Sequence, residues 1–150
     1  MRSFSKSYGL AGVRIGCLIS NKENIRILNN TKGGYETNIL SAKCLEFVIQ
    51  NENITRKYLK DTRLGLDYLK KELKILKIKS IGGKSWNFLF IIFDDVKIAR
   101  KIYIDLKNNK IATRYGFPKP FDNGILVTGG PKKEMQKFIN IFIKFIPWVM

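Results

Sequence analysis

One run of six apolar residues, Phe88 to Phe93, constrains the fold of this chain more than any other stretch. It has the length of a β-strand and shows no polar alternation, as expected for a strand that is covered on both faces. A long helical pattern with one leucine-rich face precedes it, from about Ile54 to Leu76. Helical patterns follow at Val96 to Leu106 and from Pro131 onward. These elements alternate, so they predict an α/β layer with a core of its own.

Three further strands are expected in the same half of the chain, at Ile75 to Ile81, Ile111 to Arg114 and Gly124 to Thr128. The segment from Gly116 to Asn123 contains two prolines and is predicted to be a loop. We therefore expect a small C-terminal α/β domain over residues 53–150.

The first part of the chain, residues 1–52, has fewer elements. Val13 to Ile19 reads as a mostly buried strand, and helices are expected at Lys22 to Asn30 and Ile39 to Ile49. The second of these helices has an apolar face that includes Leu40 and Phe47. One strand is too little sheet to form a core, so we expect this part to be the remnant of a larger domain.

The charge balance is strongly basic, with 28 Lys+Arg against 12 Asp+Glu and a formal net charge of +16. Nucleic acid and anionic membranes are therefore candidate partners. The basic residues are scattered, however, and the favoured interpretation is solvated faces, with no nucleic-acid or membrane partner. The longest apolar run is too short to span a bilayer, which favours a soluble, cytoplasmic protein. The chain has no His, which excludes His-based nucleophile pairs and metal sites, and we expect no metal.

The segment with the clearest chemistry is Ser-Phe-Ser-Lys-Ser-Tyr-Gly-Leu-Ala-Gly-Val-Arg-Ile-Gly, from Ser3 to Gly16. Its lysine, Lys6, lies in a predicted turn of small residues and glycines, which let the backbone approach another group closely. A partly desolvated lysine in such a turn suits a Schiff-base nucleophile. Arg14 follows eight residues later, and a guanidinium suits a phosphate group. From the residues alone, an exposed lysine in a simple connection remains an equal alternative.

The same segment closely resembles the cofactor-lysine segment of class I/II aminotransferases, in particular the histidinol-phosphate aminotransferase-like branch. The resemblance implies a fold type I enzyme dependent on pyridoxal 5'-phosphate, of which this chain would be the C-terminal part. It implies that Lys6 carries the cofactor as an aldimine, through which an amino group is transferred. It also implies that Arg14 and Ser3 bind the cofactor phosphate, with Ser5 a weaker candidate.

Looser likenesses extend along the rest of the chain. Tyr35 to Asn38 resembles the Tyr-x-x-Asn element of this branch, and Trp86 to Leu89 resembles its Ala-Asn-Phe-Leu strand entry. Ile111 to Arg114 is similar to its Val-x-Val-Arg strand, and Gly124 to Gly130 to its Leu-Arg-Ile-Thr-Val-Gly segment. The resemblance therefore covers nearly the whole sequence and implies a small-molecule amino donor, a keto or aldehyde acceptor and a homodimer.

Two departures from the family pattern affect the expected activity. The family's aspartate that partners the pyridine nitrogen lies upstream of the lysine, and only five residues precede Lys6 here. We therefore expect a fragment that is inactive by itself. In addition, Leu126 stands where the family has a substrate-carboxylate arginine, and a leucine cannot donate hydrogen bonds to a carboxylate. Either the parent protein acts on an amino compound without an α-carboxylate, such as an amino-phosphate or an amino-sugar, or this copy has lost the constraint. Arg114 could substitute from the neighbouring strand, or it could be a surface charge.

Two other functions remain open at this point. One is another reaction on the same fold, such as that of a decarboxylase. The other is a non-catalytic basic binding module, which the net charge of +16 would favour.

Overall fold

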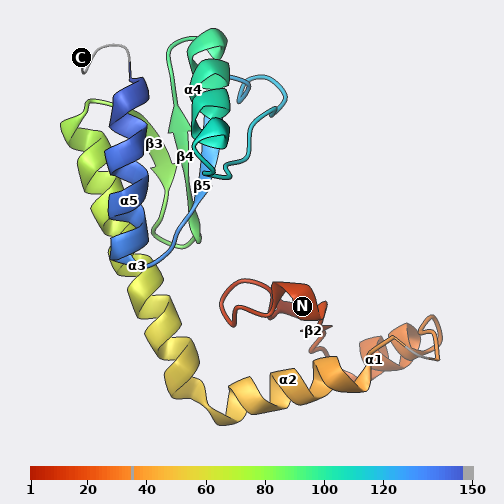
Figure 1. The fold of residues 1–150 in the computed structure, drawn as a ribbon. Helices are drawn as coiled ribbons and strands as arrows, with labels where there is room; N and C mark the ends of the chain where they lie inside the picture. Colours follow the sequence, from red (N-terminus) through yellow and green to blue (C-terminus); the bar gives the residue numbers. More distant parts are fainter. Residues whose placement is uncertain (35, 147–150) are drawn as a thin grey trace. The chain divides into compact units, whose positions relative to one another are not determined.

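The computed structural model describes residues 1–34 and 36–146. The chain forms two compact units, of which the first is Met1–Leu59 and the second begins at Lys60 (Figure 1). Helix α3 (Glu52–Ile75) belongs to both, because it begins in the first unit and ends in the second.

The second unit contains a three-stranded antiparallel sheet in the order β3-β4-β5 (Figure 1). The strands are β3 (Lys79–Gly82), β4 (Phe88–Ile92) and β5 (Gly124–Thr128). In the central strand Leu89, Phe90 and Ile91 are all buried, and consecutive strand residues point to opposite faces. The prediction of a strand covered on both faces is therefore confirmed.

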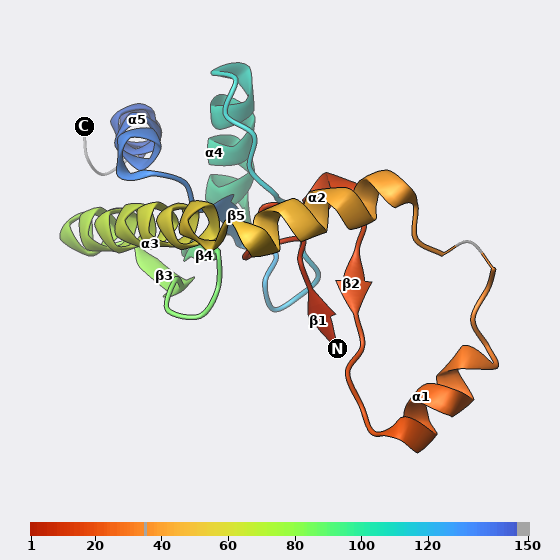
Figure 2. The same cartoon turned by 90° about the horizontal axis from the view of Figure 1, so that it is seen from below.

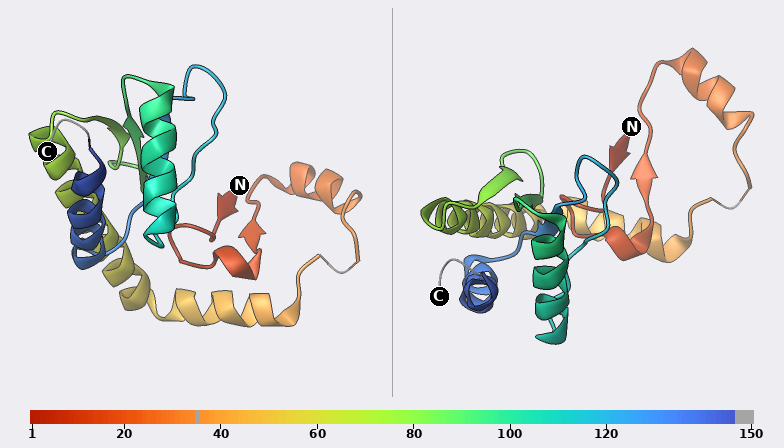
Figure 3. Two further views of the ribbon diagram at one scale, coloured as in Figure 1. Left: turned by 45° about the horizontal axis from the view of Figure 1, so that its top comes forward. Right: turned by 90° about the horizontal axis from the view of Figure 1, so that it is seen from above.

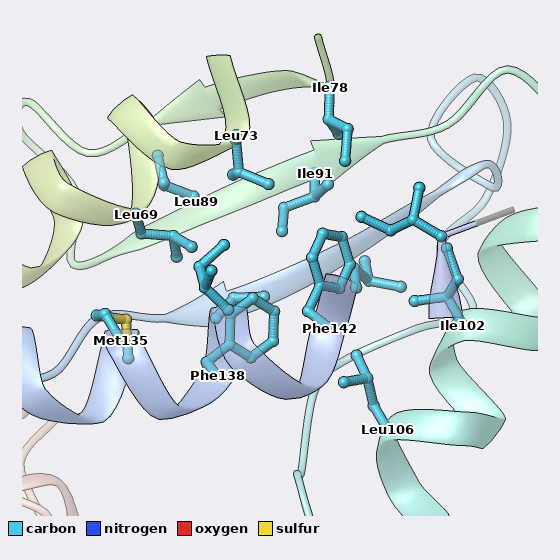
Figure 4. Packing of buried hydrophobic residues seen from close by; sticks show 14 of the residues in the cluster. Leu69, Leu73, Ile78, Leu89, Ile91, Ile102, Leu106, Met135, Phe138 and Phe142 are labelled. Atoms are coloured by element: carbon cyan, nitrogen blue, oxygen red, sulfur yellow. The ribbon is translucent and has the colours of Figure 1, made fainter. Parts of the chain in front are cut away.

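One face of this sheet packs against helices. The helices are the second half of α3, α4 (Val96–Asn108) and α5 (Lys132–Phe142). Their buried side chains converge with those of β4 and β5 into one hydrophobic cluster (Figure 4). Its members are Leu66, Leu69, Leu73, Ile78, Leu89, Ile91, Phe93, Ala99, Ile102, Leu106, Ile125, Val127, Met135, Phe138, Ile139, Phe142 and Ile146. On the opposite face, the ring of Phe90 meets the edges of Phe117 and Phe121, with centroids 5.2 and 5.9 Å away.

Two glycine-dependent contacts bring the β5–α5 connection against α3. A Cβ at Gly65 would overlap the carbonyl oxygen of Gly130, and a Cβ at Gly129 would lie 2.5 Å from Cγ of Leu66. The absence of side chains at these positions lets the two backbones approach closely. The two glycines, Gly129 and Gly130, therefore allow the connection to α5 to lie directly against α3.

Helices α3 and α4 end in the same way. Each is followed by a lysine in the left-handed region, Lys77 with φ 59° and Lys110 with φ 61°. The next residue donates its backbone N–H to the carbonyl five positions back, from Ile78 to Leu73 at 2.8 Å and from Ile111 to Leu106 at 2.9 Å. This is the Schellman motif, in which glycine is the usual left-handed residue.

Two predicted strands of this unit differ from the structure. The strand expected from Ile75 begins only at Lys79, because α3 continues to Ile75 and the left-handed Lys77 prevents an extended backbone before it. The strand expected at Ile111 to Arg114 is wrong. Only Arg114 pairs with β5, in a single bridge to Leu126, within the long connection between α4 and β5 (Figure 3).

The first unit has little regular sheet. Strands β1 (Arg2–Ser3) and β2 (Gly16–Cys17) pair antiparallel, side by side in Figure 2, and the short 3-10 helix η1 (Ala11–Val13) lies between them in sequence. The strand predicted from Val13 to Ile19 is therefore found only as the two residues of β2, and its predicted extent is wrong. Arg14 has a left-handed backbone, so an extended segment can begin only after it, and β1 offers two residues for pairing.

The helices of this unit lie close to where they were predicted. Helix α1 (Lys22–Asn29) is capped by Asn21, whose side chain accepts from the backbone N–H of Asn24 at 2.9 Å. Helix α2 (Ile39–Gln50) is capped by Asn38 in the same way. The apolar face predicted for α2 is not buried, since Leu40 is 74% and Phe47 58% exposed. Among the described residues before Lys60, Phe4 is the only hydrophobic side chain that is buried.

Candidate functional site

The predicted lysine turn is a compact, hydrogen-bonded structure. The backbone N–H of Gly9 donates to the carbonyl of Lys6 at 3.1 Å, and that of Leu10 donates to the carbonyl of Phe4 at 3.2 Å. Gly9 has φ 68°, which a glycine adopts without strain. The Phe4 ring is buried and meets the Tyr8 ring edge-on, with centroids 5.1 Å apart. Lys6 therefore occupies a turn whose backbone is fixed on both sides.

The Lys6 side chain itself is exposed. We expected the turn to shield this amine partly from solvent, and among the described residues the turn does not do so. The turn presents the ammonium outward because its one buried anchor is Phe4, two residues earlier, and no other side chain of the turn is buried. An outward amine is open to an aldehyde from solution.

Ser3 and Ser5 lie next to each other at the start of the turn. Ser3 pairs with Gly16 in the β1–β2 ladder, and its Oγ accepts a hydrogen bond from the backbone N–H of Ser5 at 3.2 Å. This bond leaves the Ser3 hydroxyl hydrogen free to donate to an anion. A side chain at Gly16, opposite Ser3, would be tightly placed, since a Cβ there would lie 3.1 Å from the carbonyl oxygen of Arg2.

Arg14 lies at the same end of the ladder as Ser5. Ser5 follows β1 and Arg14 precedes β2, each two residues from the Ser3–Gly16 pair. The Arg14 backbone is left-handed, with φ 56° and ψ 44°, a conformation that costs a non-glycine residue about 1–2 kcal/mol. Its Nη1 donates to the carbonyl of Ala11 at 3.0 Å, which uses one of five guanidinium donors. Backbone strain of this kind is concentrated at functional sites.

Ser41 is a residue of this site that the sequence did not reveal. It is buried in the first turn of α2, and its Oγ donates to the carbonyl of Val13 at 2.7 Å. This bond joins the backbone just before Arg14 to a helix that begins 25 residues later in the chain. The only signal in the sequence is a small polar residue three positions after the capping Asn38.

The remaining candidate, Arg114, belongs to the second unit. Arg114 and Leu126 exchange both backbone hydrogen bonds, at 3.1 and 2.8 Å. Directly opposed residues of an antiparallel pair place their side chains on the same face. The Arg114 guanidinium therefore emerges on the face that carries Leu126, where its carbon lies 5.1 Å from the centroid of the Phe117 ring.

Of the looser matches, Tyr35 lies outside the described residues, and Asn38 acts as the cap of α2. No cluster of three or more His, Cys, Asp or Glu residues that could hold a metal ion occurs in residues 1–34 and 36–146. Over the same ranges, no helix is long and apolar enough to cross a membrane.

Comparison with known proteins identifies the family of this chain. A sequence model of the aminotransferase class I and II family matches residues 1–141. The chain belongs to this family. Histidinol-phosphate aminotransferase of Brachyspira hyodysenteriae is 35% identical over 152 residues, covering 97% of this chain and 41% of the relative. That of Moorella thermoacetica is 29% identical over 140 residues, covering 93% of this chain and 36% of the relative.

A solved structure gives the same result for the fold. Histidinol-phosphate aminotransferase from Sinorhizobium meliloti, in complex with pyridoxal-5'-phosphate, superposes with a TM-score of 0.81 at 19% identity. The match covers 99% of this chain and 39% of that chain. The predicted fold class, part of an α/β aminotransferase fold, is confirmed. The family member described here thus spans about two fifths of the length of the proteins it matches.

Proposed function

We propose that this chain carries the cofactor lysine and part of the phosphate site of an aminotransferase that uses pyridoxal 5'-phosphate. In this proposal residues 1–52 belong to the cofactor-binding domain and residues 53–150 form the smaller α/β domain. The observation that carries the proposal is the grouping of Ser3, Ser5, Lys6 and Arg14 at one end of the β1–β2 ladder. The family match over residues 1–141 supports it.

The donors of this group fit the cofactor by their chemistry. A phosphate dianion is best bound by a guanidinium fork together with hydroxyl donors. Arg14 retains guanidinium donors beyond the one bonded to Ala11, and the Ser3 hydroxyl hydrogen is available. Lys6 supplies an exposed primary amine for the cofactor aldehyde. We therefore assign Lys6 as the residue that holds the cofactor, Ser3 and Arg14 as its phosphate ligands and Ser5 as an additional ligand.

When bound, pyridoxal phosphate supplies an electron sink for chemistry at the carbon that bears the amino group. The residues of this chain would position it. Ser41 fixes the backbone before Arg14 through its bond to Val13, and the Ser5 N–H holds the Ser3 oxygen in place. The free amine of Lys6 can also accept and return a proton at Nζ.

For the substrate, we propose an amino compound whose anionic group is bound by Arg114. Leu126 has no donor for an α-carboxylate, and Arg114 projects on the same face of the sheet. The stacking on Phe117 restrains the guanidinium without occupying its donors. An amino-phosphate presents one phosphate group that a single arginine can bind, and the acceptor would be a keto or aldehyde compound.

We also propose that the enzyme is a homodimer. Its support here is the exposed apolar surface of α2, including Leu40, Phe47 and Ile49. Size-exclusion chromatography of the enzyme, with light scattering, should give twice the mass of one monomer. An enzyme that is monomeric at all concentrations would contradict this part of the proposal.

The phosphate assignment is tested by joining this chain to the part of the Brachyspira hyodysenteriae relative that it does not match. In the joined protein, Arg14→Gln should weaken pyridoxal phosphate binding at least roughly tenfold, because a charge-assisted hydrogen bond contributes about 1.5–3 kcal/mol. Arg2→Gln is the matched control, since Arg2 is an exposed arginine of β1, and it should change binding less than about twofold. If the Arg14→Gln variant binds pyridoxal phosphate as tightly as the unsubstituted joined protein, Arg14 has a purely structural role.

A further inference from the structure

A group of lysines surrounds a hollow in the second unit. The hollow has a volume of about 360 Å³ and is lined by Lys70, Lys74, Lys77, Ile78, Lys79 and Ser80. It is formed by the end of α3 and the start of β3. All four lysines are exposed, and Ile78 is buried beneath them. Four cationic side chains therefore share one small concave surface.

The local backbone explains why these lysines face the same side. Lys70 and Lys74 are four residues apart in α3, which places them on one face of the helix, and Lys77 follows two residues after the helix ends. Lys77 is held in the left-handed conformation by the Schellman motif, and Lys79 follows at the first position of β3. The chain therefore reverses direction around the hollow, so the helix and the strand both contribute lysines to it.

The charges of this lysine hollow are not balanced by neighbouring acids. In residues 1–34 and 36–146, none of the four ammonium groups forms an ion pair with a carboxylate. Asp94 is the one acidic residue of the adjoining hollow, which Lys77 and Lys79 also line. The carboxyl end of α3 carries a partial charge of only about −0.5. Asp67 adds a second carboxylate, three residues before Lys70 on α3. Two carboxylates and one helix end still leave an excess of positive charge among four lysines, and like charges at this spacing repel each other.

We propose that the lysine hollow is a binding site for a compact phosphate anion of the diphosphate or triphosphate class. Such an anion carries several negative charges within a few ångströms and would neutralise the lysines at one point. A nucleic-acid backbone would need a basic groove that continues along the strand, whereas these lysines converge on one hollow.

The test measures pyrophosphate binding to the 150-residue chain by isothermal titration calorimetry at low and at physiological salt. The double variant Lys70→Gln/Lys74→Gln should weaken binding at least roughly tenfold, since each lost charged contact is worth about a tenfold change or more. The control Lys119→Gln/Lys133→Gln removes the same charge from exposed lysines outside the hollow and should change affinity less than about twofold.

Three results would overturn the proposal. The first is the absence of saturable pyrophosphate binding, and the second is an equal loss of affinity in both double variants. The third is that a single-stranded oligonucleotide binds more tightly than pyrophosphate and that the Lys70/Lys74 variant abolishes this binding. The last result would assign the hollow to nucleic acid. Thermal unfolding without pyrophosphate and with pyrophosphate at a concentration of 5 to 10 times its dissociation constant gives a second readout. A ligand that binds the folded state raises the unfolding midpoint. The midpoint of the Lys70/Lys74 variant should not respond.

Discussion

Replacing Gly65 with alanine tests the packing of α5 against α3. In an open helix this change is stabilising by about 1 kcal/mol, because alanine has the higher helix propensity. Here the new Cβ would overlap the carbonyl oxygen of Gly130 and lie 3.1 Å from Cγ of Met135. The carbonyl is backbone, so the β5–α5 connection must move as a whole, and Gly129 is already close to Leu66.

Overpacking of this kind costs about 1–3 kcal/mol, and the rigidity of the contact places it at the upper end. The net effect of Gly65→Ala should therefore be a loss of about 2 kcal/mol, which lowers the thermal midpoint of a unit of this size by about 8–16 °C. Circular dichroism melts measure it. Lys71→Ala, an exposed site on the same helix, is the control and should change stability by less than about 0.5 kcal/mol. A Gly65→Ala midpoint equal to or above that of the original chain would refute the close approach of the two segments.

Two further predictions concern the helix ends and the lysine turn. Lys77→Gly and Lys110→Gly should each stabilise the chain by up to about 1 kcal/mol, because glycine adopts the left-handed conformation without the Cβ penalty. Urea midpoints measure this, and a loss of stability in both variants would contradict the Schellman geometry. Ser41→Ala should cost about 1–3 kcal/mol locally by leaving the Val13 carbonyl unpaired. Hydrogen exchange should then speed up around residues 11–14 and not in the second unit, and unchanged exchange there would show that the bond is absent.

Elements that depend on local sequence were predictable. The strand at Phe88 and the helices α3, α4 and α5 follow from apolar periodicity. The predictions for the second unit differ from the structure at the ends of elements: β3 begins later than predicted because the backbone of Lys77 is left-handed. A lysine in that conformation is not visible in a pattern of apolar residues.

Elements that depend on distant partners were not predictable. Val13 to Ile19 has the composition of a strand, yet its pairing is limited by the two residues of β1 and by the backbone of Arg14. The segment ending at Arg114 likewise pairs with β5 at one residue only. In the candidate site, the motif located Lys6 and Arg14 in sequence. It did not reveal the bond from Ser41, 28 residues from Val13, or the exposure of Lys6.

The identity of the cofactor lysine is the central claim, and borohydride labelling tests it most directly. The joined protein, loaded with pyridoxal phosphate, is reduced so that the cofactor is trapped on the amine that holds it, and its peptides are mapped by mass spectrometry. We expect the label on Lys6 alone, and its loss in Lys6→Ala without transfer to another residue. Label on a different lysine, or spread over many lysines in the intact protein, would contradict the assignment.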